Sequence, residues 1–170
     1  MKKEILTVVI ALFLGGQSFA QFFKTDSISK SEVTKLEFLV GNWEGKGWMM
    51  GRDGTKSEFD QTEKIEFKLD STAILIEGQG KSNGMIVHNA MAIVSYNKED
   101  VSYSFQSYLQ NGQKNEFKGE LINGKFHWYP NDNMRYIIWL NENGQWFETG
   151  EFNREGTWHQ FFEMTLDRVE

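Results

Sequence analysis

Hairpin turn signals recur at short intervals after residue 41, and they limit the fold more than any other feature of the sequence. The dipeptide Asn-Gly occurs at residues 83–84, 111–112, 123–124 and 143–144. Both of its residues tolerate the positive φ values that a tight hairpin needs. Since short hairpins join antiparallel neighbours, this part of the chain is predicted to be a meander of antiparallel strands.

Between the turns lie runs in which apolar and polar residues alternate. In "TEKIEFKL", for example, Ile65, Phe67 and Leu69 share one face and the charged residues between them share the other. About ten such runs follow one another, and Pro130 is the only proline in the sequence. A sheet of about ten strands curls and tends to close, which removes its exposed edges.

The predicted fold is therefore all-β: an up-and-down antiparallel barrel of about ten strands. A β-sandwich is the alternative, but it needs a long crossing connection, and the sequence shows none. The segment "SISKSEVTKLEFLV" precedes the first strand and predicts a short helix, because Val33, Leu36 and Leu39 or Val40 recur at helical spacing. Ser29 and Glu32 resemble a capping box, and Gly41 is expected to end the helix.

The first twenty residues have the pattern of a secretory signal peptide. Lys2 and Lys3 precede an apolar stretch at residues 5–14, and Ser18-Phe19-Ala20 resembles a cleavage site. We expect cleavage after Ala20, a lead-in at 21–28, and one barrel domain at 29–170 in a periplasmic or secreted protein. The alternative is a buried N-terminal helix. No stretch of the sequence predicts a transmembrane span.

The composition excludes several classes of function. The chain has no cysteine, so thiol catalysis and cysteine metal sites are excluded. A net charge of -6 and a sequence pI near 5.2 disfavour nucleic acids and anionic membranes as partners. Aromatic residues make up 15% of the chain, a load that either fills a core or lines a cavity.

The segment "GNW" directly after a short helix resembles the opening of the lipocalins and their calycin relatives. In those proteins the tryptophan closes one end of the barrel and packs against a basic side chain from the last strand. The resemblance assigns these structural roles to Trp43 and to Arg168 in "EMTLDRVE". A cation stacked on a large ring is a physically reasonable plug. The alternative is a tryptophan in an ordinary core.

"FLVGNWEGKG" and "FFEMTLDRV" also resemble the two ends of a bacterial family of exported barrels of unknown function, related to the nitrobindins. In that comparison Gly45 and Gly47 are points where the strand can bend. Nitrobindins bind haem through a histidine near the end of the last strand, where this sequence has Glu163 or Met164. His159 could replace it only with a shifted register. We therefore expect no cofactor, with haem as an alternative.

The expected ligand is a small apolar molecule inside the barrel. The aromatic and apolar residues predicted to line this cavity are Trp48, Phe67, Met91, Tyr103, Phe105, Trp128, Tyr136, Trp146 and Phe162. The polar candidates are His88 and Arg135. Four glutamates lie in apolar strands: Glu63, Glu77, Glu148 and Glu163. On an exposed face they are ordinary surface residues, whereas inside the barrel they would be costly unless paired.

No catalytic signature is present: the sequence has no G-x-S-x-G elbow, no phosphate-binding glycine loop and no dinucleotide fingerprint. The three histidines lack metal-ligand spacing. The sequence therefore favours a non-catalytic carrier or binding barrel. The alternatives are a haem-dependent redox or isomerase barrel, and a barrel filled by its own side chains that acts through its surface, with a homodimer as one form.

Overall fold

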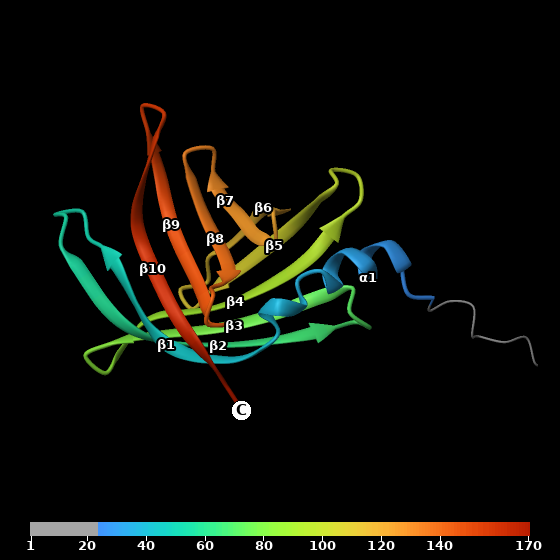
Figure 1. Ribbon diagram of the computed structural model, residues 1–170, viewed down its shortest axis with the longest axis horizontal. Helices are drawn as coiled ribbons and strands as arrows, with labels where there is room; N and C mark the ends of the chain where they lie inside the picture. Colours follow the sequence, from blue (N-terminus) through green and yellow to red (C-terminus); the bar gives the residue numbers. More distant parts are fainter. Residues whose placement is uncertain (1–23) are drawn as a thin grey trace, which may run out of the picture.

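The computed structural model describes residues 24–170, so the predicted signal peptide and the predicted cleavage site lie outside the described residues. Ten antiparallel strands form one closed barrel in the order β1-β10-β9-β8-β7-β6-β5-β4-β3-β2. Their bounds are β1 Gly41–Met50, β2 Lys56–Lys68, β3 Ala73–Ser82, β4 Met85–Asn97, β5 Ser102–Leu109, β6 Lys114–Ile122, β7 Lys125–Asn131, β8 Met134–Leu140, β9 Trp146–Arg154 and β10 Thr157–Val169. The predicted all-β barrel is confirmed (Figure 1).

The Asn-Gly dipeptides lie in hairpin turns, although they form two kinds of turn. At 83–84 and 123–124 both residues have positive φ, as a two-residue type I′ turn requires. At 111–112 and 143–144 only the glycine has positive φ, and the loops are longer. In the first of these, the Leu109 amide donates to the Gln113 carbonyl at 2.9 Å.

The barrel closes where the first strand meets the last. Residues 42–49 of β1 pair with residues 162–169 of β10, and Trp43 lies directly opposite Arg168. On its other edge β1 pairs with β2 over residues 41–50. The two ends of the predicted meander therefore lie side by side.

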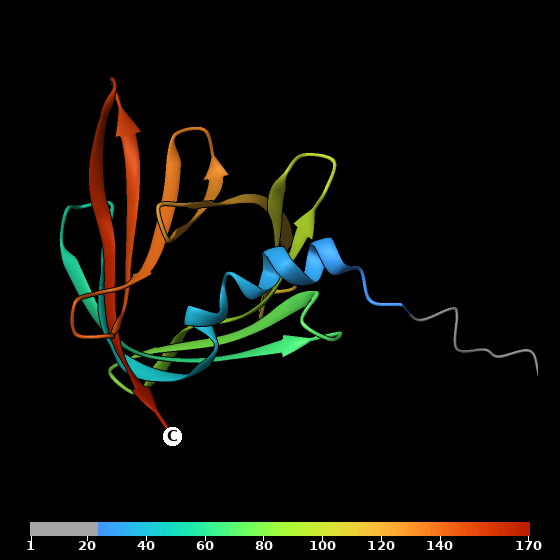
Figure 2. The ribbon, with the colours of Figure 1, turned by 45° about the vertical axis from the view of Figure 1, so that its right-hand side comes forward.

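A helical segment before β1 covers one end of the barrel (Figures 1 and 2). It consists of α1 (Ser27–Thr34) and a 3₁₀ turn, η2 (Glu37–Leu39). Val33, Leu36 and Leu39 are fully buried, as their helical spacing predicted. Within residues 24–170 no helix is long and apolar enough to cross a membrane.

The helix starts and ends differently from the prediction. Asp26 is the N-cap, because its side chain accepts hydrogen bonds from the amides of Ile28 and Ser29. The proposed capping box at Ser29 is therefore wrong, since Ser29 already lies inside the helix. Gly41 does not end α1 either: it is the first residue of β1.

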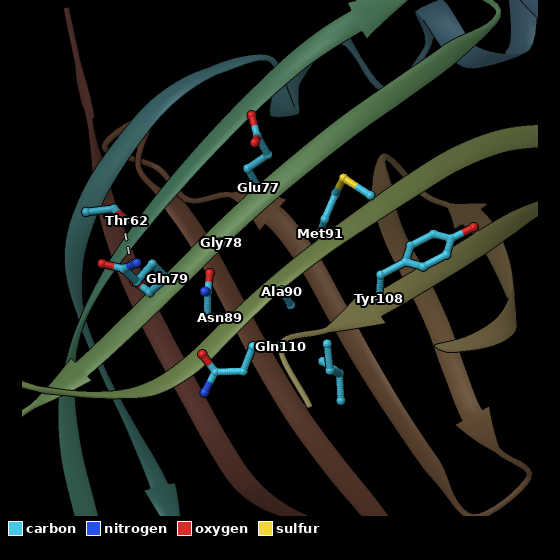
Figure 3. Close-up of a pocket in the computed structure, with 10 residues that line it drawn as sticks. Thr62, Glu77, Gly78, Gln79, Asn89, Ala90, Met91, Tyr108 and Gln110 are labelled. Atoms are coloured by element: carbon cyan, nitrogen blue, oxygen red, sulfur yellow. Dashed lines mark hydrogen bonds between the residues drawn. The ribbon is translucent and has the colours of Figure 1, made fainter. Parts of the chain in front are cut away.

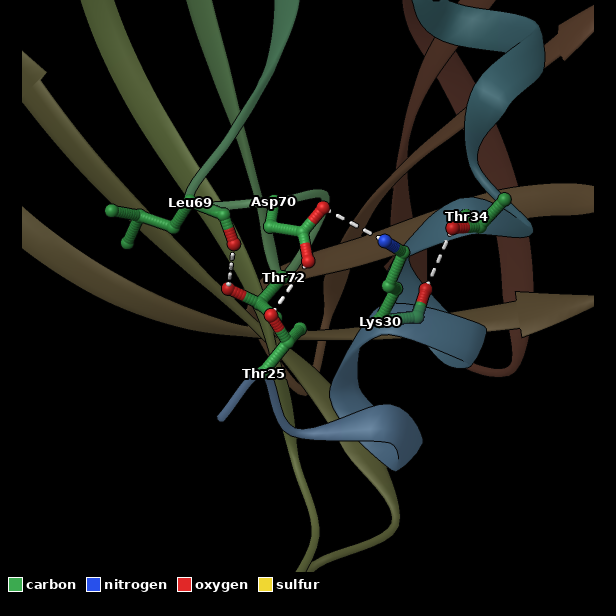
Figure 4. A network of polar contacts seen from close by, with 6 residues as sticks. All are labelled: Thr25, Lys30, Thr34, Leu69, Asp70 and Thr72. Carbon is green, nitrogen blue, oxygen red and sulfur yellow. Dashed lines mark hydrogen bonds and ion pairs between the residues drawn. The ribbon is translucent and has the colours of Figure 1, made fainter. Parts of the chain in front are cut away.

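Ion pairs fasten α1 to two turns at this end of the barrel. Asp70, in the turn between β2 and β3, accepts from Thr25 at 2.6 Å and pairs with Lys30 at 2.8 Å (Figure 4). Lys98, in the turn between β4 and β5, pairs with Asp26. These contacts are exposed, so we regard them as positioning the helix more than stabilising it.

Trp43 and Arg168 form the seam at the covered end. The Arg168 guanidinium lies 4.2 Å above the Trp43 ring and donates to the carbonyl of Val40. The indole of Trp43 donates to the Leu39 carbonyl at 2.8 Å. Gly41 has φ of +141°, and a Cβ there would lie 2.3 Å from the guanidinium. A glycine therefore precedes Asn-Trp because no side chain fits beneath the arginine.

Candidate functional site

The barrel encloses a cavity of about 510 Å³. The end beneath α1 is sealed, since Trp43, Leu36 and Leu39 are fully buried there. The cavity walls extend to Met49 and Val87 at the opposite end, where these side chains are 44% and 56% exposed. The cavity therefore opens at the end away from the helix.

Stacked aromatic rings form one wall of the cavity. Trp128 of β7 lies opposite Tyr136 of β8, with ring centroids 4.3 Å apart and planes within 4°. Phe105 of β5 stacks on the other side of Trp128 at 4.7 Å. Because facing aromatic pairs are favourable on one side of a sheet, these rings form a rigid apolar surface.

A β-bulge in β10 extends this wall. The pairing of β10 with β9 shifts between Gln160 and Phe162, which leaves Phe161 as the extra residue. Phe161 and Phe162 both contact the Tyr136 ring edge-on, at 5.6 and 5.5 Å. Gly150 lies beneath them: a Cβ there would lie 2.9 Å from Phe162 and 3.0 Å from Phe161. The bulge and the glycine together allow two consecutive phenylalanines on the inner side.

Two buried glutamates form the polar part of the cavity. Glu63 of β2 is 8% exposed and Glu148 of β9 is 6% exposed, and both line the cavity. Gln61 donates to Glu63 Oε1 at 2.6 Å, and the Trp146 indole donates to Glu148 Oε2 at 3.3 Å. Within residues 24–170, the buried Oε2 atom of Glu63 has no hydrogen-bond partner.

Glycines on the two neighbouring strands make room for the inward-facing side chains of β2, which are Phe59, Gln61 and Glu63. A Cβ at Gly78 would lie 2.6 and 2.7 Å from the two carboxylate oxygens of Glu63. A Cβ at Gly80 would lie 2.7 Å from Gln61 Oε1, and one at Gly47 would lie 2.4 Å from the Phe59 ring. The glycines in β1 and β3 therefore do more than let a strand bend: they yield space to polar and aromatic side chains of β2.

Burial controls the ionisation of both carboxyl groups. Burial raises the pKa of Glu148 to about 8; the negative charge of Glu63 adds to the rise, and the indoles of Trp146 and Trp128 oppose it. Burial likewise raises the pKa of Glu63 to about 7, against the hydrogen bond from Gln61. The charge of Glu63 therefore acts on Glu148 across the cavity, and the raised pKa values of both carboxyl groups lie near neutral pH.

Seven of the residues predicted for the cavity line it: His88, Met91, Phe105, Trp128, Tyr136, Trp146 and Phe162. Met91 also borders a hollow on the outer side of the barrel. That these side chains contact a ligand stays a prediction.

Two of the predicted cavity residues, Trp48 and Arg135, lie on the outer face. Trp48 is five positions from the inward-facing Trp43, so the period of two places it on the opposite side. Lys56 Nζ lies 3.4 Å above its ring. Arg135 pairs with Glu151 at 2.7 Å and lies above the Trp158 ring at 4.1 Å. Arg135 therefore cannot anchor a carboxylate inside the barrel.

Two others, Tyr103 and Phe67, pack at the sealed end. The Tyr103 hydroxyl donates to the Glu32 carbonyl of α1 at 2.9 Å, and burial raises the pKa of Tyr103 to about 12. Phe67 packs against the same buried cluster. Tyr103 therefore joins the helix to the barrel, and neither residue lines the cavity.

The four glutamates of the apolar strands divide evenly. Glu63 and Glu148 face inward, whereas Glu77 borders the outer hollow and Glu163 accepts from Gln160 at 2.8 Å. The sequence held a signal for the inner pair: Glu63 shares its parity with Ile65, and Glu148 shares its parity with Trp146. Gln61, at the same parity as Glu63, was missed.

The residues do not fit a haem held from the last strand. Of the two residues at the expected ligand position, Met164 lines the cavity and Glu163 does not. His159 stacks on Phe152 at 5.4 Å, outside the cavity lining. His88 lines the cavity from β4, on a different strand. Haem needs a firm axial ligand, and a lone thioether is a weak one.

A second hollow lies on the outer side of β2 to β5 (Figure 3). Thr62, Gln79 and Asn89 contribute polar groups to it, and Thr62 donates to the Gln79 carbonyl at 3.4 Å. It is shallow and mostly polar, whereas the interior cavity is deeper and lined by aromatic and other apolar side chains. The interior cavity is therefore the candidate site.

The closed ten-stranded antiparallel barrel, the helix that covers one end and the interior cavity together define a cavity-containing β-barrel fold. Two solved structures share it. Rv2717c from M. tuberculosis aligns with a TM-score of 0.58 and 9% identity, over 81% of this chain and 97% of its own. An S-type phycobiliprotein lyase, CpeS from Guillardia theta, aligns with a TM-score of 0.56 and 13% identity, over 86% of this chain and 98% of its own.

At these identities the two likenesses show the fold alone. No protein-family profile matches the sequence, and no curated protein matches it. The function must therefore be argued from the cavity.

Proposed function

We propose that this chain is an exported, non-catalytic carrier barrel that binds a small molecule with an apolar body. The interior cavity is the observation that supports this proposal. Its volume of about 510 Å³ falls within the roughly 300–1,000 Å³ range of small-molecule sites. One of the similar barrels is named a phycobiliprotein lyase, but the likeness extends only to the fold.

The cavity also disfavours the alternative of a barrel that is filled by its own side chains. Ala92 of β4 faces inward with Ser107 of β5 opposite, so this part of the wall carries small side chains. Large rings line another part of the wall at Trp128 and Tyr136. The small side chains leave a space inside the barrel that the described part of the chain does not fill.

Binding of the neutral fluorophore N-phenyl-1-naphthylamine tests the proposal. We expect its emission to rise and shift to the blue with the wild-type protein. Ala92→Phe places a ring in the cavity, and we expect it to weaken binding about tenfold or more, because the added ring occupies the ligand's volume. Ile93→Phe adds bulk at the next position, on the outer face, and is the matched control.

Thermal unfolding of all three proteins shows whether each variant is folded. A wild-type protein that leaves the fluorophore unchanged, or an Ile93→Phe variant that loses binding as fully as Ala92→Phe, would overturn the cavity as the binding site. If Ala92→Phe fails to fold, Ser107→Phe on the facing strand provides the same test.

A further inference from the structure

We propose that the ligand carries a positively charged amine on its apolar body, and that Glu63 and Glu148 hold this amine inside the barrel. This inference rests on the proposed function, because it assigns a chemical class to the ligand of the same cavity. The residues of the polar part of the cavity support it in three steps.

First, Glu63 presents an acceptor that the protein leaves open. Gln61 occupies Oε1, and Gly78 lies directly behind the carboxylate. Oε2 is buried without a partner in the described part of the chain. A buried acceptor without a donor is costly and uncommon in native proteins. A ligand N–H that reaches this oxygen would remove that cost.

Second, Glu148 supplies another carboxyl group to the same space. It receives one indole hydrogen bond from Trp146, and its ionisation is opposed by the charge of Glu63. Two carboxylates that face one cavity repel each other, and a cation between them converts this repulsion into attraction. A protonated amine offers up to three N–H donors and can therefore contact both groups.

Third, the cavity lining described here contains no lysine or arginine. Its titratable side chains are Glu58 near the mouth, Glu63, His88, Tyr136 and Glu148. The acidic groups thus lack a basic partner in the lining, and their negative charge disfavours an anionic ligand. The aromatic wall suits the apolar body of the ligand, and ring faces also attract cations.

The same groups predict how binding depends on pH. The amine pairs with ionised carboxyl groups, and burial places the pKa values of Glu63 and Glu148 at about 7 and about 8. Tyr136 stays neutral, since burial raises its pKa further. Desolvation lowers the pKa of His88, so it loses its charge before Glu148 ionises fully. Affinity for the amine should therefore rise from pH 6 to pH 8.5.

Three probes with one naphthyl body test the inference: 2-(1-naphthyl)ethylamine, 1-propylnaphthalene and 3-(1-naphthyl)propionate. Each is measured by displacement of N-phenyl-1-naphthylamine at pH 8.5. We expect the amine to bind about tenfold or more tightly than the neutral probe, and the carboxylate to bind most weakly. Only the affinity of the amine should rise between pH 6 and pH 8.5.

Neutralising one carboxyl group identifies its role. Glu63→Gln and Glu148→Gln should each weaken binding of the amine about tenfold relative to binding of the neutral probe by the same variant. Glu66→Gln removes the same charge from the outer face of β2, where Glu66 pairs with Lys64 and Lys68. We expect this control to bind all three probes like the wild type.

The outcomes separate the two proposals. If the neutral fluorophore does not bind, the proposed function fails. Two results would overturn the amine assignment while leaving the proposed carrier function intact. One is that the fluorophore binds but the protein binds the amine no more tightly than 1-propylnaphthalene. The other is that Glu63→Gln does not change the affinity for the amine. Preference for the propionate would overturn the assignment as well.

Discussion

Gly78 lacks a side chain because the carboxyl group of Glu63 occupies the space that one would need. Together with Gln61 and Gly80 it forms a small unit in which β2 supplies polar groups and β3 supplies room. Such a unit has no use in an ordinary core, since an apolar side chain at Glu63 would cost less to bury. Its presence is the residue-scale reason to treat the cavity as functional.

Glu148→Gln should change how stability depends on pH in the ligand-free protein. Burial raises the pKa of Glu148 from 4.5 to about 8, so the folded state favours the protonated form. The stability that this group contributes is complete below pH 4.5 and is lost as the pH rises towards 8. Glutamine stays neutral throughout. Between pH 5 and pH 9 the variant should therefore gain about 4 kcal/mol in free energy of unfolding relative to the wild type.

Urea denaturation at pH 5, 7 and 9 measures this difference. Glu66→Gln is the control, because its lysine partners lower the pKa of Glu66. Ionisation of Glu66 therefore changes the stability of the protein only at pH values below about 4.5, outside the range measured. Parallel curves for wild type and Glu148→Gln over the whole range would contradict a buried, uncompensated carboxyl group.

At the scale of elements, the turn pattern predicted the strands well because hairpin chemistry is local. An Asn-Gly dipeptide favours its turn whatever lies elsewhere in the chain. Parity within one strand also carries information, and the prediction of Trp48 as a cavity residue was wrong because Trp48 has the opposite parity to the inward-facing Trp43. Tyr103 has inward parity yet packs under α1. Parity gives the face of a strand but not the height along the barrel, which depends on pairing between strands.

The start of α1 shows the same limit on a smaller scale. The sequence predicted a cap at Ser29 with Glu32, whereas Asp26 is the N-cap and also pairs with Lys98 in a distant turn. Asp26→Ala should lower the free energy of unfolding by about 1 kcal/mol, because two amides lose their acceptor.

Ser29→Ala is the matched control for the cap and should change stability by less than about 0.5 kcal/mol. Chemical denaturation of the two variants and the wild type provides the comparison. A larger loss in Ser29→Ala than in Asp26→Ala would restore the capping box at Ser29 and contradict the observed start of the helix.

At the scale of the whole molecule, the sequence predicted a closed barrel from strand number, and the resemblance predicted its seam at Trp43 and Arg168. That Glu63 and Glu148 line the same cavity could not be predicted from the sequence. They lie on β2 and β9, which are not neighbours, so only the curvature of the closed sheet brings them to one cavity. The nature of the ligand site is thus a property of closure and not of any single strand.

Export concerns the whole chain and is tested directly. If residues 1–20 are a signal peptide, expression of the full sequence in a bacterium should place a protein that begins at Gln21 outside the cytoplasm. Intact-mass measurement of each cell fraction provides the readout. A cytoplasmic product that retains residues 1–20 would contradict the proposed localisation while leaving the cavity proposals untouched.

The helix that covers one end of the barrel has a consequence for kinetics. With that end sealed, a molecule inside must depart by the route through which it arrived. The β3–β4 hairpin borders the open end of the cavity and carries the exposed side chains of Met85, Ile86 and Val87. The residence time of a bound ligand should therefore depend on fluctuations of this hairpin. Substitutions in the hairpin should alter the residence time without changing the residues that determine ligand specificity.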